Sequence, residues 1–310
     1  MGNEYEISLP QVIRIEPAAS CNFKCIHCPT GLDMSPTGIM TMETFNKIAS
    51  NLEKIVARQG HPLKVIVLYH SGEPLLNKHF FEMVRRAKTL AKSVKTVTNG
   101  SRLNDETIEQ IVDSELDHIE ISLDGISAKE NDKIRLNPVG ATFESVSKQV
   151  IALIKRRREK IKQLPKVTIS NTQIPESTEQ VEQEPQPPQY MVDTFREVAN
   201  DITYNCNWAL IWPGMPIKIQ NKPERNYCDY VVNTMTVRSS GDIVPCCYDL
   251  VSKMPMGNAT QQSIEEIWNN KRYQGIRRAI KEFKPPSLCK NCPVLYKFTP
   301  MVKSDIFPEK

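Results

Sequence analysis

Apolar residues follow two alternating spacings along the first two thirds of the chain. Short runs such as Leu63–Tyr69 are nearly all apolar and β-branched, which is typical of a strand buried on both faces. Between these runs, apolar residues recur three and four apart, as they do after Thr41, and this spacing predicts amphipathic helices. The predicted strands are Val12–Ile15, Leu63–Tyr69, Val94–Thr98, Ile119–Leu123, Lys166–Ile169 and Asp201–Ile211.

Strands that alternate with helices form βαβ units around a parallel sheet, so we expect an α/β fold. About six such units fit before residue 212. Beyond that point the pattern predicts a β-hairpin, with strands at Val231–Val237 and Ile243–Val244. A helix should follow, because Ser263 and Glu266 have the spacing of a capping box.

Two segments interrupt the alternation. Residues 174–189 are rich in Pro, Gln and Glu, which favours an exposed, flexible excursion; a substrate lid is the alternative. Lys155–Lys162 (KRRREKIK) adds a basic run to a predicted helix. We interpret this run as a solvated helix face, with an RNA-binding edge as the alternative.

The composition narrows the function classes. The chain has 310 residues, of which 40% are hydrophobic and 25% charged, so a mostly disordered or collagen-like protein is excluded. It contains no run near the ~18 apolar residues of a membrane span and no secretory signal, so we expect a cytoplasmic protein. The 40 Lys and Arg residues against 36 Asp and Glu are too small an excess to indicate nucleic acid.

Nine cysteines without a secretion signal favour metal-binding or catalytic thiols over disulfides. Cys21, Cys25 and Cys28 form a C-x3-C-x2-C loop after the first predicted strand. Three thiolates at this spacing can bind a 4Fe–4S cluster and leave one iron open to an exogenous ligand. Zinc with His27 as its fourth ligand is the alternative. The other cysteines are Cys206, Cys228, Cys246, Cys247, Cys289 and Cys292.

The cysteine loop is followed by SGEPLL (Ser71–Leu76), TNG (Thr98–Gly100) and SLDG (Ser122–Gly125). This ordered set resembles the radical S-adenosylmethionine (SAM) superfamily over roughly residues 11–210. The resemblance implies a partial (β/α)6 TIM barrel over residues 1–212. It also implies that the open iron binds SAM, whose cleavage gives a 5′-deoxyadenosyl radical that takes hydrogen from a substrate.

The resemblance also implies individual roles. Cys21, Cys25 and Cys28 would bind the cluster, and His27 takes the place of an aromatic residue beside the adenine. The expected SAM contacts are Gly72 and Glu73 at the amino group, Asn99 near the ribose, and Ser122 and Arg135 near the carboxylate.

A second cysteine site is predicted near the C-terminus. Cys228, Cys246, Cys289 and Cys292 would suit either zinc or an iron–sulfur cluster. The stretch GDIVPCCYD…MGNATQQSIEEIW…LCKNC resembles the auxiliary-cluster extension of SPASM and twitch radical SAM enzymes. Because no cysteine follows Cys292, the likeness is to the shorter twitch form, with one auxiliary 4Fe–4S cluster in a small domain over residues 213–310. Cys247 is an alternative to Cys246 as ligand.

The spacing is similar to that of the twitch-type dehydrogenase that oxidises an aminocyclitol alcohol in butirosin biosynthesis. That likeness implies a small sugar-like or aminocyclitol-like substrate, oxidation of an alcohol to a ketone, and a reductant such as flavodoxin or ferredoxin. Tyr69, His70 and Asp124 lie at the ends of predicted strands and are candidates for the base.

Three alternatives remain at this stage. An epimerase would return a hydrogen atom to the substrate from Cys247 or Cys206. A maturase would modify a ribosomal peptide, although only about eleven residues precede the first predicted strand, which counts modestly against a peptide substrate. A zinc-scaffold or RNA-binding protein without SAM chemistry is the third alternative.

Overall fold

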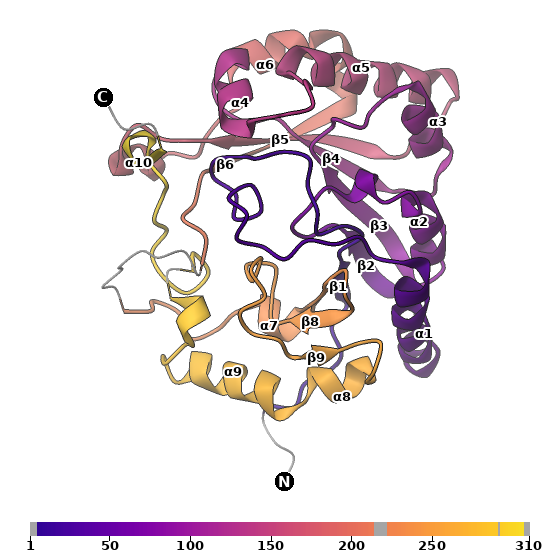
Figure 1. Ribbon diagram of the computed structural model, residues 1–310, viewed down its shortest axis with the longest axis vertical. Helices are drawn as coiled ribbons and strands as arrows, with labels where there is room; N and C mark the ends of the chain where they lie inside the picture. Colours follow the sequence, from indigo (N-terminus) through magenta and orange to yellow (C-terminus); the bar gives the residue numbers. More distant parts are fainter. Residues whose placement is uncertain (1–4, 214–221, 291, 307–310) are drawn as a thin grey trace.

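Six strands pair in parallel and in chain order, and they curve into a partial barrel (Figure 1). The computed structural model describes residues 5–213, 222–290 and 292–306. The prediction of an α/β partial barrel is therefore confirmed. The strands are β1 (Val12–Ile15), β2 (Leu63–Leu68), β3 (Ala91–Thr98), β4 (His118–Ser122), β5 (Lys166–Gln173) and β6 (Ile202–Trp208).

Helices cover the outer side of the curved sheet, while the loop after β1 lies inside the curve (Figure 1). The helix predicted after Thr41 is confirmed, since the Thr41 side chain accepts a backbone hydrogen bond from the first turn at 3.1 Å. Asn104 starts a later helix in the same way, at 2.8 Å. In the described ranges, no helix is both long and apolar enough to cross a bilayer. The helices are α1 (Met42–Gln59), α2 (Phe80–Lys88), α3 (Asp105–Asp113), α4 (Ala128–Arg135), α5 (Phe143–Glu159) and α6 (Gln189–Thr194).

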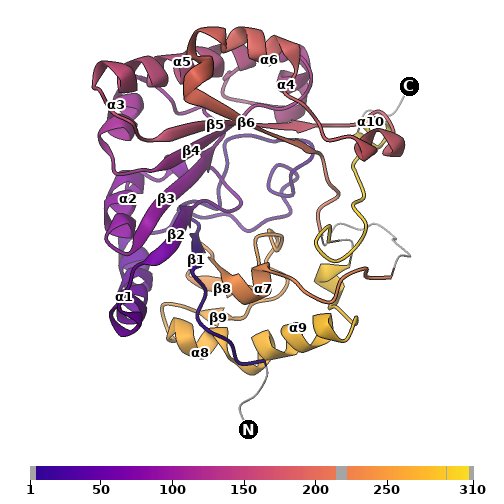
Figure 2. The same ribbon diagram turned by 180° about the vertical axis from the view of Figure 1, so that it is seen from behind.

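The C-terminal elements continue the barrel sheet beyond β1, and both views place them at that end (Figures 1 and 2). Strand β7 (Thr234–Val237) pairs in parallel with β1, and β8 (Asp242–Val244) and β9 (Gly257–Asn258) follow in antiparallel order. The predicted capping box at Ser263 is present. The helices here are α7 (Tyr230–Asn233), α8 (Ile264–Trp268) and α9 (Lys271–Lys281). The last helix, α10 (Lys303–Ile306), lies at the other end of the sheet, near β6 (Figure 1).

The prediction of one strand over Val231–Val237 was wrong in its first half. The chain forms a helical turn there because the backbone carbonyl of Asp229 accepts from Val232 and Asn233, at 3.2 and 2.8 Å. The apolar side chains of this segment suit a buried helix turn as well as a strand, so hydrophobicity alone cannot separate the two.

The two faces of β1 have different surroundings. Ile13 and Ile15 are fully buried and pack in the same core as the α1 side chains Ile48 and Leu52. Alternate residues of a strand point to opposite faces, so Arg14 points to the inner side of the barrel.

The basic run at the end of α5 is compensated by carboxylates from neighbouring elements. Lys155 pairs with Glu197 at 2.8 Å, and Arg156 pairs with Glu109 at 2.6 Å. The remaining pairs are Arg157 and Arg158 with Asp201, and Lys160 with Glu109 and Asp113. The partly exposed pairs of Lys155, Arg156 and Arg158 fit the interpretation of a solvated helix face, whereas Arg157 is buried and departs from it.

Residues 174–189 form a strap between β5 and α6 that includes a short 3-10 helix, Thr178–Glu182. Trp208 of β6 donates from Nε1 to the carbonyl of Gln183 at 2.8 Å, and Gln173 donates to that of Gln186 at 2.7 Å. These two hydrogen bonds hold the strap against the C-terminal ends of β5 and β6.

Candidate functional site

The three N-terminal cysteines lie on the loop between β1 and α1, inside the curve of the sheet (Figure 1). The backbone of Ile26 donates to Ile134 of α4 at 3.0 Å, and Cys28 donates to Cys25 at 3.1 Å. The Cys25 thiol also lies 3.6 Å from the backbone oxygen of Arg135. The loop is therefore fixed between the strand ends and the C-terminal turn of α4.

Burial raises the pKa of two of these thiols, Cys21 and Cys25. It raises the pKa of Cys25 to about 12, although the Arg135 guanidinium acts in the opposite direction. The pKa of Cys21 is also raised by burial, and Glu73 and Cys28 contribute further. Over the described ranges, no three His, Cys, Asp or Glu side chains converge closely enough for a single metal ion. Three thiols on one loop, close enough to affect one another electrostatically, fit the wider ligand set of a 4Fe–4S cluster.

The segment after β2 packs against the cysteine loop without space for a side chain at Gly72. A Cβ atom there would lie 2.4 Å from the backbone oxygens of Ala18 and Ser20. Glu73 is buried and accepts hydrogen bonds from Leu75 N at 3.0 Å, Thr98 Oγ1 at 2.7 Å and Asn99 N at 2.7 Å. Its carboxylate therefore joins the ends of β2 and β3, an intramolecular role that the sequence did not predict.

The predicted ribose contact, Asn99, faces the cysteine loop. Its Nδ2 donates to Asn22 Oδ1 at 2.8 Å and lies 3.8 Å from the Cys21 sulfur. Gly100 follows with a φ of 76°, in the left-handed region that glycine adopts without strain. The TNG motif thus places an amide directly beside one thiol of the trio.

The two predicted carboxylate contacts have different surroundings. Ser122 is the last residue of β4 and is half-buried. Arg135, on α4, is buried and forms an ion pair with Asp124 at 2.7 Å, while its guanidinium stacks 5.1 Å from the ring centre of Phe23. The carboxylate of Asp124, one of the three candidate bases, is therefore already paired with the Arg135 guanidinium.

Four cysteines that are distant in sequence come together in the C-terminal region. Cys228 precedes α7, Cys246 follows β8, and Cys289 and Cys292 flank the end of a short 3-10 turn. Burial raises the pKa of Cys289 and of Cys292 to about 12, and each of these two is also raised by neighbouring thiols, including Cys228. Burial raises the pKa of Cys246, and the neighbouring Cys247, Cys289 and Cys292 act in the same direction. This donor set fits a second 4Fe–4S cluster with four protein ligands.

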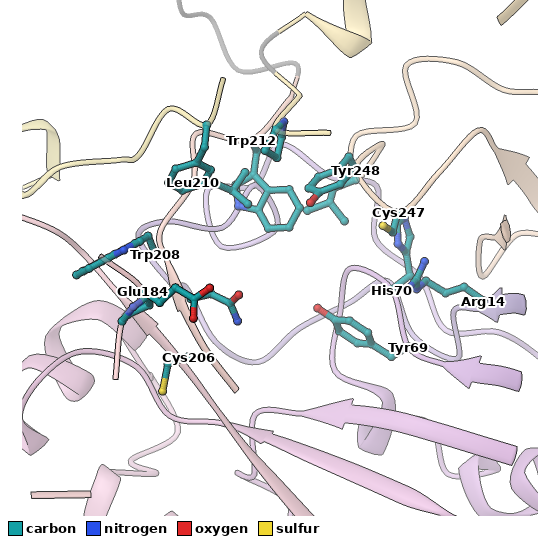
Figure 3. Close-up of a pocket in the computed structure, with 15 residues that line it drawn as sticks. Arg14, Tyr69, His70, Glu184, Cys206, Trp208, Leu210, Trp212, Cys247 and Tyr248 are labelled. Carbon is teal, nitrogen blue, oxygen red and sulfur yellow. The ribbon is translucent and has the colours of Figure 1, made fainter. Parts of the chain in front are cut away.

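A cavity of about 660 Å³ lies between the strand ends and this C-terminal region (Figure 3). Both cysteines predicted as hydrogen donors line it, at different ends: Cys206 beside Trp208 and Glu184, and Cys247 beside Arg14 and His70. The full lining is Arg14, Tyr69, His70, Glu184, Pro185, Cys206, Asn207, Trp208, Leu210, Trp212, Cys247, Tyr248, Leu250, Pro293 and Phe298.

Aromatic side chains connect the cavity to the first cysteine loop. Trp212 donates from Nε1 to the backbone oxygen of His27 at 2.9 Å, and its ring lies 5.8 Å from that of Tyr248. The pKa of Tyr69 is raised by burial, with a contribution from the nearby Cys28. The cavity is therefore bounded on one side by the first cysteine loop.

Several lining residues were missed by the sequence reasoning. Arg14 interrupts an apolar strand, and strand alternation alone could have placed it on the inner face. Trp212 and Tyr248 lie in segments without a predicted element, and no sequence signal marked them.

Comparisons with known proteins agree with this geometry. Residues 15–183 match the radical SAM superfamily, and residues 228–293 match SPASM, an iron–sulfur cluster-binding domain. The chain is 26% identical to a tungsten-containing aldehyde ferredoxin oxidoreductase cofactor-modifying protein of Pyrococcus furiosus, over 90% of this chain and 86% of that protein.

Two further proteins are similar over a shorter part of the chain or at a lower sequence identity. The chain is 29% identical to the mycofactocin maturase MftC of Mycobacterium ulcerans, over 43% of this chain and 34% of that protein. Among solved structures, BtrN in complex with AdoMet and 2-DOIA superimposes with a TM-score of 0.60 at 19% identity, over 92% of this chain and 93% of that one. This likeness shows a shared fold.

Proposed function

Because the chain belongs to the radical SAM superfamily and carries a SPASM domain, we propose that it oxidises an alcohol of a small molecule held in the 660 Å³ cavity. The net change is the loss of one hydrogen from carbon and one from oxygen, which leaves a ketone. The cavity is the main observation in support of this proposal. It lies between the first cysteine loop and the C-terminal cysteine region, and its volume suits a small molecule.

The two domains imply SAM and two 4Fe–4S clusters as cofactors. When bound, these groups supply a 5′-deoxyadenosyl radical that abstracts hydrogen and an acceptor for the second electron. Cys21, Cys25 and Cys28 would hold the first cluster. The second would be held by Cys228, Cys246, Cys289 and Cys292.

The surroundings of each expected SAM contact indicate whether its backbone or its side chain would bind SAM. The close packing of Gly72 favours backbone recognition at the motif after β2, because the Glu73 oxygens already accept three hydrogen bonds. Asn99 and Ser122 remain as side-chain contacts. Arg135 would contribute a hydrogen bond in addition to its pair with Asp124.

Among the candidate bases, His70 is the one left to remove the hydroxyl proton once Asp124 and Tyr69 are set aside, although its low pKa makes it a weak base. Asp124 is paired with Arg135, and the pKa of Tyr69 is raised by burial, so its phenol keeps its proton. His70 lines the cavity, and neither of its ring nitrogens has a hydrogen-bond partner. Burial lowers its pKa well below the usual value, which keeps the imidazole neutral and able to accept a proton.

One observation favours a second candidate function. The thiols of Cys247 and Cys206 both face the cavity, so either could return a hydrogen atom to a substrate carbon, as an epimerase requires. The relative that aligns along most of the chain is named for modifying a cofactor, whereas the maturase aligns over less than half, so a peptide substrate has less support.

Isotope analysis separates the two functions. The protein is reconstituted anaerobically, reduced with dithionite and incubated with SAM and candidate alcohols in deuterated water. Oxidation gives a product two mass units lighter and one 5′-deoxyadenosine per turnover. A product that instead keeps its composition and gains deuterium at carbon identifies an epimerase, and the loss of that deuterium in Cys247→Ala or Cys206→Ala identifies the donor.

A further inference from the structure

We propose that Arg14 binds an anionic group of the substrate, a carboxylate or a phosphate, at the β1 end of the cavity. This inference rests on the proposed function, because it specifies the chemistry of the molecule that the cavity accepts.

The position of Arg14 is fixed by the sheet. It lies in β1 opposite Val67 of β2 and Thr236 of β7, with the two buried isoleucines of β1 on either side. Its side chain therefore extends from the middle of a sheet with paired strands on both sides. Figure 3 shows it at one end of the cavity, beside His70 and close to Cys247.

The guanidinium of Arg14 has donors without acceptors. Its Nε and Nη1 atoms are buried and have no hydrogen-bond partner, and none of the ion pairs found in the described parts of the chain includes it. The buried arginines Arg135, Arg238 and Arg277 each have one nitrogen without a partner, but their other nitrogens form ion pairs or hydrogen bonds. Arg135, Arg157 and Arg238 each pair with a carboxylate, and Arg277 donates to two backbone oxygens and an amide oxygen.

The neighbours of Arg14 supply no negative charge. The Cys247 thiol accepts a hydrogen bond from Arg14, and none of Cys247, His70 and Tyr69, which line the cavity with Arg14, is a carboxylate. His70 and Tyr69 are neutral for the reasons given above. Arg14 as a residue is half-buried, but its Nε and Nη1 atoms are shielded from water. Shielded donors without acceptors are costly, so the free energy of the site favours the entry of an anion.

A guanidinium suits this role because its planar set of donors matches a carboxylate or phosphate group. The other end of the cavity carries the opposite charge, since Glu184 of the strap lines it (Figure 3). Repulsion from that carboxylate would keep the anionic group at the Arg14 end. The rest of the substrate would then extend past Tyr69 and along Trp212, the side chains that border the first cysteine loop.

Arg14 could instead offset the charge of thiolates that hold the second cluster, because it lies beside Cys247, next in sequence to Cys246. The two roles make different predictions. A substrate contact changes the affinity for anionic molecules, whereas a cluster contact changes the reduction potential of that cluster.

The test is a calorimetric titration of the anaerobically reconstituted, SAM-bound protein with glycerol, glycerate and glycerol 3-phosphate. These probes share a carbon skeleton and differ in their anionic group, so they also separate a carboxylate from a phosphate. We expect one of the two anions to bind about 10- to 100-fold more tightly than glycerol, the range for hydrogen bonds to charged groups. Arg14→Gln should abolish this preference, and Arg14→Lys should retain part of it. Arg196→Gln, which removes an exposed arginine of a surface ion pair, should have no effect.

Equal binding of the three probes, or an anion preference that survives in Arg14→Gln, would overturn the inference. An altered midpoint potential of the second cluster in Arg14→Gln, with unchanged probe binding, would assign the guanidinium to the cluster instead. Cleavage of SAM is measured on the same samples. If SAM is cleaved but no anion preference is found, this inference alone fails, and if SAM is not cleaved, the proposed function fails.

Discussion

At the scale of single residues, Glu16 connects the barrel to the C-terminal region. One of its carboxylate oxygens accepts from the backbone and hydroxyl of Ser71, and the other accepts from Ser239 N at 2.9 Å and Arg238 Nε at 3.1 Å. Both members of the Glu16–Arg238 pair are almost fully buried. One carboxylate therefore fixes the end of β1, the end of β2 and the turn after β7.

Removing that charge should be costly. Glu16→Gln leaves the Arg238 guanidinium buried without its anion, and we expect a loss of about 3 to 5 kcal/mol in the free energy of unfolding. Urea denaturation of the cluster-free protein measures it. Glu43→Gln is the matched control, because it removes an exposed pair with Lys47 and should leave the midpoint unchanged. Equal midpoints for the two variants would contradict this account.

The raised thiol pKa values predict how the cluster-free protein reacts. The thiolate is the nucleophilic form of cysteine. Because the pKa of Cys25 is about 12, the fraction of Cys25 present as thiolate keeps increasing with pH well above pH 9. Iodoacetamide should therefore alkylate Cys25 slowly at pH 7, with a rate that rises about tenfold per pH unit through pH 10. Glutathione, an unburied thiol, should level off earlier. A plateau for the Cys25 peptide near pH 8.5 in mass spectrometry would disprove the shift.

At the scale of elements, the loops at the strand ends depend on close backbone contacts. Gly72→Ala would place a methyl group within 2.4 Å of two backbone oxygens, which cannot move independently of the sheet. We expect a lower unfolding midpoint and weaker SAM binding. Gly275→Ala is the control, because nothing lies within 4 Å of the new Cβ on α9, and a helical Gly→Ala change stabilises by about 0.5 to 1 kcal/mol. Similar effects of the two substitutions would contradict the packing argument.

Elements with strong local signals were predictable from the sequence. Thr41 and Ser263 start helices because their side chains satisfy backbone donors of the first turn, and this chemistry is visible in four consecutive residues. The turn after Asp229 was not predictable, because its apolar residues suit a strand equally well. The bonds of Glu73 to Thr98 and Asn99 depend on contacts about 25 residues apart, which only the folded sheet brings together.

At the scale of the whole molecule, the C-terminal region extends the sheet that carries the first cysteine loop. Because β7 pairs with β1, the two cysteine sites are connected through adjacent strands, and the cavity lies between them. The region should keep its sheet when the second cluster is lost, since β7 is held by β1 and by the Glu16–Arg238 pair.

The choice of ligand at the second site is open to a direct test. Cys246→Ser should lower the iron content of the reconstituted protein by about half, because one of two four-iron clusters is lost, while the circular dichroism stays that of the wild type. Cys247→Ser should keep the full iron content. A reversal of these two results would make Cys247 the ligand in place of Cys246.

The account depends most on SAM chemistry at the first cysteine loop. The decisive measurement is 5′-deoxyadenosine formation, followed by chromatography and mass spectrometry, after anaerobic reconstitution and reduction with dithionite. We predict that the wild-type protein forms 5′-deoxyadenosine and that Cys25→Ala forms none while keeping the second cluster. A wild-type protein that holds iron at Cys21, Cys25 and Cys28 and leaves SAM intact under these conditions would contradict the account.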